Sequence, residues 1–211
     1  LMLPHKSRSS VLAVGAHGVG YSLYVQFKRA VQVESLGAAV LLWLDNVGAL
    51  TVRAGIGSPS SVVVFGGAAK ALGALLLLVL VAGWALALRA YARGPESAER
   101  LVLAAAAPVV AFVAFGKVFS PQYLTWLVLL VPLAAAGTGV AASALLAVAC
   151  VLTQLWFFRQ QQIPQAGGVV WLVLVRDLLV ACVYAALAAE LWRGARRSGP
   201  MSRTSGASSA M

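Results

Sequence analysis

Charged residues are scarce in this sequence. Of 211 residues, 10% are charged and 61% are hydrophobic, and the mean hydropathy is +0.90. A soluble domain of this size carries about 25% charged residues. The composition therefore excludes an ordinary soluble domain and indicates an integral membrane protein.

Residues that bind metals or act as nucleophiles are equally sparse. The chain has two cysteines and two histidines, and none has the spacing of a metal site. Cys150 and Cys182 each lie in an apolar run, which is typical of small buried thiols. The Gly-rich phosphate loops and nucleophile elbows of soluble enzymes are also missing. We therefore expect no metal and no cofactor.

The net charge of +10 would suggest nucleic-acid binding in a soluble protein. Single-strand binding needs a basic surface interleaved with exposed aromatic rings, and the sequence has no such pattern. Basic residues here flank apolar runs, where they set the orientation of membrane helices. We expect membrane lipids as partners and no nucleic acid.

Long apolar runs predict an all-α, polytopic bundle, because about 20 apolar residues cross the hydrocarbon core as a helix. Five spans are expected, at about 69–91, 98–115, 121–136, 140–158 and 168–193. The third is expected to begin at Pro121, which suits the first turn of a helix. The shorter run at 35–50 contains Asp45 and Asn46, which could form a helix-breaking turn or belong to a site, and we expect the turn. This run predicts an interfacial, re-entrant or protein-buried helix.

The ends of the chain differ from the apolar middle. Residues 1–16 are expected to be a poorly defined, truncated amino terminus, and residues 17–193 the transmembrane portion. Residues 194–211 are basic and then rich in Ser and Gly, a composition that cannot bury enough apolar surface to fold. We expect a disordered tail there.

Counting basic residues predicts the orientation. One side would hold the connection after the first span and the carboxy-terminal tail, with Arg89, Arg93, Arg100, Arg193, Arg196, Arg197 and Arg203. The other side would hold Arg53, Lys70, Lys117 and Arg159. Because Lys and Arg collect on the cytoplasmic side, we expect a multi-pass protein of the cell membrane with a cytoplasmic carboxy terminus.

Three polar segments, at 26–35, 117–122 and 159–165, would then share the outer side. Cations beside amide and carboxylate groups suit a phosphate and sugar hydroxyls. The candidate substrate-binding residues are Lys28, Arg29, Gln32, Glu34, Ser35, Lys117, Ser120, Gln122, Tyr123 and Arg176. The alternative is that the lysines and arginines extend to the headgroups and that Tyr123 belongs to an interface belt.

Arg176 and Asp177 lie near the middle of the last expected span. Ionisable residues there are costly and usually face a polar cavity or a partner. Neighbouring helical residues point about 100° apart, so we expect these two not to satisfy each other fully. An ion pair between helices is the alternative.

The segments "KRAVQVESLGAA" and "GKVFSPQYLTWLVLLVPL" resemble the carboxy-terminal half of the glycosyltransferase 87 family, which are GT-C-type polytopic membrane enzymes. The family pattern R-x-x-Q-x-E-S is matched at 29–35, and K-x-x-S-P-Q-Y at 117–123. The pair at 176–177 is similar to an Arg-Asn pair of the family, with Asp in place of Asn.

This resemblance implies transfer of a hexosyl group, commonly mannosyl, from a polyprenyl-phosphate donor. The acceptor would be a lipid-linked or cell-envelope glycan on the outer face. The family's base is an acidic residue in the first outer loop, for which this chain has no candidate. We therefore expect no catalytic residue here, with the base upstream and the chain alone inactive. Glu34 is assigned to hydroxyl binding, because Lys28 and Arg29 nearby would lower its pKa and weaken it as a base.

Two other functions are considered. In a small-solute or lipid transporter subunit, Arg176 and Asp177 would line a pathway. The third possibility is a membrane scaffold without catalytic activity.

Overall fold

The computed structural model describes residues 31–57, 61–134, 139–158 and 167–197, together with residues 18, 21, 24 and 28–30. Residues 1–30 and 31–211 form two compact units. In the first unit, the Lys28 ammonium lies 4.8 Å from the centre of the Tyr24 ring. The expected polar connection at 159–165, the amino-terminal residues 1–16 and residues 198–211 of the expected tail lie outside the described residues.

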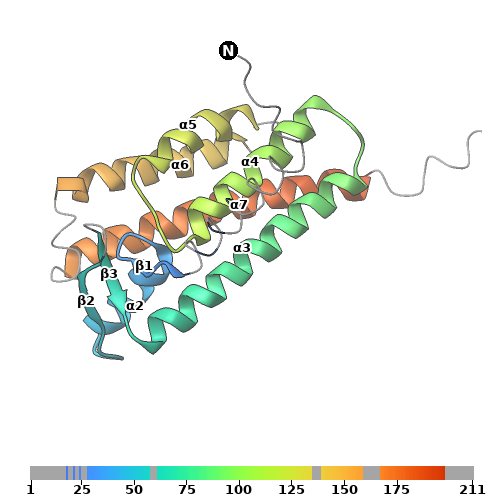
Figure 1. The fold of residues 1–211 in the computed structure, drawn as a ribbon. Coiled ribbons are helices and arrows are strands. Elements are labelled where there is room, and N and C mark those ends of the chain that lie inside the picture. Colours follow the sequence, from blue (N-terminus) through green and yellow to red (C-terminus); the bar gives the residue numbers. More distant parts are fainter. Residues whose placement is uncertain are drawn as a thin grey trace, which may run out of the picture. The chain divides into compact units, whose positions relative to one another are not determined.

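Helices make up most of the second unit (Figure 1). Within the described ranges they are α2 (Leu36–Asn46), α3 (Gly67–Arg93), α4 (Ala98–Phe115), α5 (Tyr123–Leu133), α6 (Gly139–Trp156) and α7 (Gly167–Arg197). Of these, α3, α4, α6 and α7 are long and apolar enough to cross a membrane. The predicted all-α membrane bundle is confirmed, and four of its five expected spans are long helices.

The fifth expected span, at 121–136, forms a shorter helix. Helix α5 has 11 residues and is about 16 Å long, less than a full crossing requires. It begins after Pro121, because the Ser120 and Pro121 carbonyls accept hydrogen bonds from the Tyr123 and Leu124 amides, at 2.8 and 3.1 Å. A tight turn therefore occupies the place where the first helical turn was expected.

Helix α4 has the bounds that its sequence predicts. Ser97 is its N-cap, and the side-chain oxygen accepts a hydrogen bond from the Arg100 amide at 3.2 Å. Glu99 lies in the first turn, where a negative charge is favoured by the helix dipole. The Trp84 indole of α3 donates to the Pro108 carbonyl of α4 at 2.9 Å, which links the two helices.

A small sheet, not expected from the sequence, lies beside α2 (Figure 1). Its strands are β1 (Val31–Gln32), β2 (Arg53–Ile56) and β3 (Val62–Phe65), in the order β1-β3-β2 and antiparallel throughout. Val31 pairs with Val64, and Arg53 pairs with Phe65. Helix α2 buries Leu36, Ala38, Leu41 and Leu42, so among the expected alternatives it is the protein-buried helix. The predicted turn after it also forms, with the Asp45 carboxylate accepting from the Val52 amide at 3.1 Å.

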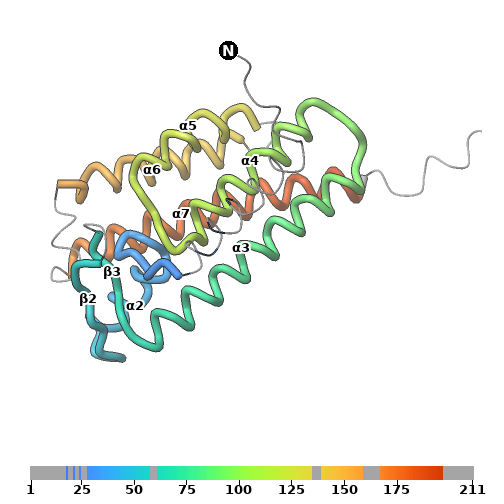
Figure 2. Tube along the Cα trace, viewed as in Figure 1, coloured from blue at the N-terminus to red at the C-terminus, as the bar shows by residue number. Residues whose placement is uncertain are grey.

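Two apolar clusters fill the interior of this unit. The first cluster contains side chains of α3, α4, α5, α6 and α7, such as Val110, Leu127, Leu146 and Leu187. The other lies between α2, the sheet and the first half of α7. Helix α7 contacts α2, α3, α4 and α6, and Figure 2 shows it running through the unit. It therefore belongs to both clusters.

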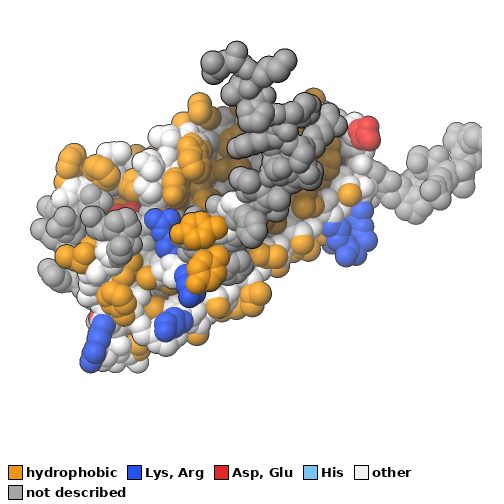
Figure 3. Space-filling view, in the orientation of Figure 1, with side chains coloured by type: hydrophobic (Ala, Val, Ile, Leu, Met, Phe, Trp, Pro, Cys, Tyr) orange, Lys and Arg blue, Asp and Glu red, His pale blue; other side chains and the backbone are white. Residues whose placement is uncertain are grey.

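The outer surface of the long helices is apolar. On α3, large side chains including Leu78, Val81 and Leu88 are exposed, and Figure 3 shows hydrophobic side chains along this helix. Patches of this extent are rare on soluble monomers and suit contact with lipid tails. Cys182 is exposed and Cys150 is half-buried, so the expectation that both thiols are buried was wrong. Cys182 points outward from α7, where apolar surroundings come from lipid rather than from protein.

Candidate functional site

The two motif segments meet beside the sheet. The Gln32 amide of β1 donates to the Lys117 carbonyl at 2.9 Å, and the Val33 amide donates to the Val62 carbonyl of β3 at 3.1 Å. The α4–α5 connection therefore lies along β1, as Figure 2 shows. The bond between Gln32 and Lys117 brings together residues that lie more than 80 positions apart.

A tight turn between β1 and α2 fixes the position of Glu34. The Ser35 hydroxyl donates to the Gln32 carbonyl at 2.7 Å, and the Ser35 amide donates to the same oxygen at 3.0 Å. Ser35 is also the N-cap of α2, and its carbonyl accepts from the Ala39 amide at 2.9 Å. Ser35 is buried, so it holds the turn rather than facing a ligand.

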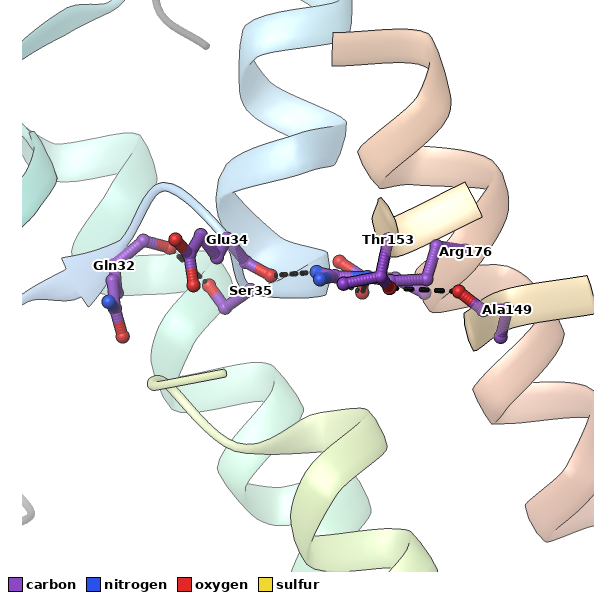
Figure 4. A network of polar contacts seen from close by, with 7 residues as sticks. Gln32, Glu34, Ser35, Ala149, Thr153 and Arg176 are labelled. Atoms are coloured by element: carbon purple, nitrogen blue, oxygen red, sulfur yellow. Dashed lines mark hydrogen bonds and ion pairs between the residues drawn. The ribbon is translucent and has the colours of Figure 1, made fainter. Parts of the chain in front are cut away.

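Arg176 of α7 supports this turn from the other side (Figure 4). The side chain is fully buried, and its Nη2 donates to the Glu34 carbonyl. Its Nε donates to Asp177 Oδ1 at 2.8 Å, and Nη2 lies 2.7 Å from the same oxygen. The guanidinium carbon lies 3.7 Å from the centre of the Phe119 ring and 5.0 Å from that of Trp156. Arg176 thus joins α7 to the turn, to the α4–α5 connection and to α6.

Arg176 and Asp177 pair directly although they are neighbours on one helix. The alternative of an ion pair between helices was therefore wrong for the described residues. Attraction between two charges is strong in a buried environment, and this favours a direct pair. As expected, the pair does not satisfy both groups: Arg176 Nη1 and Asp177 Oδ2 have no hydrogen-bond partner among the described residues.

A cavity of about 810 Å³ opens next to the turn. We call it the Glu34 cavity. Its polar lining residues are Gln32, Glu34, Ser120, Gln122, Thr125, Thr153 and Gln154. Its remaining lining residues are Pro121, Leu124, Val128, Leu129, Cys150 and Phe157. Carboxyl, amide and hydroxyl groups thus share one cavity with an apolar wall built by α5 and α6.

Four of the predicted binding residues line this cavity: Gln32, Glu34, Ser120 and Gln122. Ser35 and Arg176 instead hold the turn. Tyr123 stacks on Trp126, with 4.8 Å between ring centres, and packs within the bundle.

The predicted cations are not among the lining residues. The Lys117 side chain runs along α3, where its Cε would lie 3.4 Å from a Cβ placed on Gly73. Lys28 and Arg29 belong to the separate first unit. The cavity lining by itself therefore supplies hydrogen-bonding groups and a carboxyl, without a basic side chain among the described residues.

Several lining residues were missed from the sequence. Thr125 lies two residues after the end of the second motif, and Thr153 and Gln154 interrupt the long apolar run of α6. The Thr153 hydroxyl donates to the Ala149 carbonyl of its own helix at 2.8 Å, as Figure 4 shows. A polar pair inside an uncharged, otherwise apolar helix was the signal that could have identified α6 as a wall of the site.

Burial raises the pKa of Glu34 from its ordinary 4.5 to about 7. Arg176 acts in the opposite direction, while the neighbouring Asp177 raises the pKa further. The expectation that Lys28 and Arg29 lower this pKa was wrong in direction, because the cost of removing the carboxylate from water outweighs the attraction of the nearest cation.

Comparison with models of protein families, with curated proteins and with solved structures finds no match for this chain.

Proposed function

We propose that this chain is a membrane glycosyltransferase of the glycosyltransferase 87 type. It transfers a hexosyl group, mannosyl in the first instance, from a polyprenyl-phosphate donor to a lipid-linked or cell-envelope glycan. The observation that carries the proposal is the Glu34 cavity, in which hydrogen-bonding groups and an apolar wall lie together beside α6, a helix long enough to cross a membrane.

The two walls of the cavity suit the two ends of such a donor. Amide and hydroxyl groups of Gln32, Ser120 and Gln122 can hydrogen-bond sugar hydroxyls. On the apolar side, Val128, Leu129 and Phe157 can contact the first isoprene units of the lipid. A soluble sugar nucleotide has no lipid chain that could contact this apolar wall.

The donor phosphate needs cations that the lining does not contain. Lys117 stands three residues before Ser120, and Arg29 belongs to the first motif. We assign the phosphate to Lys117, since charge-assisted contacts are the strongest that a phosphate can make. Arg29 lies in the first unit, and its role in phosphate binding stays a prediction from its motif. Arg176, already bonded to Glu34 and Asp177, acts by holding the turn.

The same proposal places the cavity at the outer face of the cell membrane. Arg100 binds the carbonyls of Ala90 in α3 and Leu191 in α7, so it lies at the ends of those helices that are remote from the β1–α2 turn. This basic end would be cytoplasmic, together with the carboxy terminus, and the cavity would face the opposite side.

The test uses Cys150, which lies in the cavity wall, as a reporter of donor binding. In a Cys182→Ser chain in detergent, polyprenyl-phosphate mannose should slow alkylation of Cys150 by N-ethylmaleimide, while mannose alone should not. The matched control is a Cys150→Ser chain, in which the exposed Cys182 should react at one rate with or without donor. Transfer of labelled mannose to a membrane glycolipid extract completes the assay. A donor that neither protects Cys150 nor yields labelled product contradicts the proposal.

The transporter alternative receives less support from the same geometry. Arg176 and Asp177 are 0% and 1% exposed, and they are not among the residues that line the Glu34 cavity. Groups that line a transport pathway have to meet water or solute, whereas these two meet each other.

A further inference from the structure

We propose that Glu34 is the general base of the transfer reaction and takes the proton from the acceptor hydroxyl. The inference rests on the proposed function, and it places the base within this chain rather than in a preceding segment.

Position distinguishes Glu34 from the other acidic residues. The Asp45 carboxylate accepts from the Val52 amide, Asp177 pairs with Arg176, and Glu190 pairs with Arg193. Glu96 and Glu99 lie at the connection and first turn that join α3 to α4. Glu34 is the acidic residue that lines the cavity in the described part of the chain.

The surrounding contacts hold the backbone of Glu34, and Glu34 is one of the residues that line the cavity. The carbonyl of Glu34 is bonded by Arg176, and the residues on both sides are fixed by the Ser35–Gln32 hydrogen bonds. Gln32 also has a buried side-chain oxygen, Oε1, without a hydrogen-bond partner among the described residues. An unpaired buried acceptor in a cavity wall indicates a missing donor, and a sugar hydroxyl beside Glu34 supplies one.

The pKa of the Glu34 carboxyl also suits a general base. The pKa of Glu34 is raised to about 7, chiefly by burial, and a general base works best when its pKa lies near the operating pH. The charged groups that act on the pKa of Glu34 are Arg176 and Asp177 of α7. Cys150 of α6 lines the same cavity, and Asp45 of α2 is bonded to the Val52 amide. Arg176 keeps the ionised form accessible near neutrality by opposing the effect of burial.

The reaction balances with Glu34 as its only proton acceptor. The acceptor O–H bond breaks, and its proton moves to the Glu34 carboxylate. The acceptor oxygen forms a bond to the anomeric carbon, while the bond from that carbon to the phosphate oxygen breaks. The leaving polyprenyl phosphate takes the electron pair and becomes a dianion, so the carboxylate charge is transferred to the phosphate. Glu34 then releases its proton to water.

The first measurement is the rate of mannosyl transfer between about pH 5 and pH 9. Glu34 accepts a proton only when ionised, so the rate should rise with pH and level off above about pH 7. Glu34→Gln should lower the plateau by about 10²- to 10⁴-fold, with donor protection of Cys150 retained. Glu34→Asp should recover part of the rate. The matched control, Glu96→Gln, removes an exposed acid and should leave the profile unchanged.

The second measurement needs no turnover. Infrared difference spectra of the chain should show carboxylic C=O absorption that titrates near pH 7 and is weaker in Glu34→Gln by the contribution of one carboxyl group. Titrating absorption of unchanged intensity in that variant, or a Glu34→Gln chain that transfers at nearly the original rate, overturns the inference. If the unaltered chain neither transfers mannose nor binds the donor, the proposed function itself fails.

Discussion

Two buried arginines occupy opposite ends of the helical unit and have different partners. Arg100, at the start of α4, donates to the carbonyls of Ala90, Tyr91 and Leu191 at 2.8 to 3.4 Å. Each of these carbonyls lies in the last two turns of its helix, where the helix dipole is negative. Arg176, in the first half of α7, bonds the backbone carbonyl of Glu34 in the β1–α2 turn and takes Asp177 as its counter-charge.

The difference teaches what each end can do. Backbone carbonyls bond both Nη atoms of Arg100 within a packed helix end, while its buried Nε has no partner among the described residues. Arg176 instead pairs with the carboxylate of Asp177 and supports the β1–α2 turn. That turn contains Glu34, which lines the cavity. One arginine joins helices, and the other positions a residue that can take part in chemistry.

Removing Arg176 should have the larger effect on stability. Arg176→Met leaves Asp177 buried without its partner, which costs about 3–5 kcal/mol. Replacing both residues, as Arg176→Met with Asp177→Leu, should recover most of that loss, because no uncompensated charge remains. Unfolding by SDS in mixed micelles, followed by tryptophan fluorescence, measures both variants. A double variant no more stable than the single one would show that the pair is not the source of the effect.

Lys117 tests whether the cavity end binds phosphate. Lys117→Ala should slow mannosyl transfer by about 10²- to 10³-fold, equivalent to roughly 2–4 kcal/mol, because a cation that stabilises the leaving phosphate is lost. Arg29→Ala should act in the same direction. Lys70→Ala removes an exposed lysine in the first turn of α3 and serves as the control. Near-normal transfer by Lys117→Ala and Arg29→Ala would identify both as headgroup-contacting residues.

How far the sequence predicts the fold depends on the length of each element. Composition over 18 or more residues is enough to identify α3, α4, α6 and α7 as membrane-crossing helices. The strands β2 and β3 have four residues each, too few for an alternating pattern to be distinguished from an apolar run. β3 was visible only as Val62, Val63 and Val64 after a Gly- and Ser-rich stretch, which is a weak strand signal.

The pKa of Glu34 in the candidate site could not be predicted from the local sequence either. Sequence neighbours suggested that Lys28 and Arg29 control Glu34. In the structure the controlling effects are burial and Arg176, which lies 142 positions away. Burial depends on how α2, the sheet and α7 pack, and no local motif encodes that packing. The motifs therefore identified four residues that line the cavity, Gln32, Glu34, Ser120 and Gln122, but not the raised pKa of Glu34.

At the other end of the unit, Arg100→Met should cost about 1.5–3 kcal/mol, the usual contribution of hydrogen bonds from a charged group. The loss should be smaller than for Arg176→Met, since no opposite charge is left behind. Mannosyl transfer per folded molecule should not change, because Arg100 contacts only helix ends. SDS unfolding and transfer assays on the same preparation separate the two effects. A loss of transfer without a loss of stability would contradict the division between the two ends.

Single cysteine substitutions, which should disturb the fold least, test which side of the membrane the cavity end and the Arg100 end of the unit face. Single cysteines at Val118, in the α4–α5 connection, and at Glu96, in the α3–α4 connection, replace residues that are half-buried and exposed. Glu96 is preferred over Gly94, because a Cβ at Gly94 would collide with the Arg100 guanidinium. Both changes should alter stability by less than about 0.5 kcal/mol, as is usual for surface substitutions.

Each cysteine is placed in a chain with Cys150 and Cys182 replaced by serine. In intact cells, a membrane-impermeant thiol reagent should label Val118→Cys, whereas Glu96→Cys should react only after lysis. The expected difference follows from the proposed outer position of the cavity and the basic, cytoplasmic position of the Arg100 end. Labelling in the opposite order would place the Glu34 cavity on the cytoplasmic side. An outer-face acceptor would then be out of reach, even if the carboxyl of Glu34 titrates as proposed.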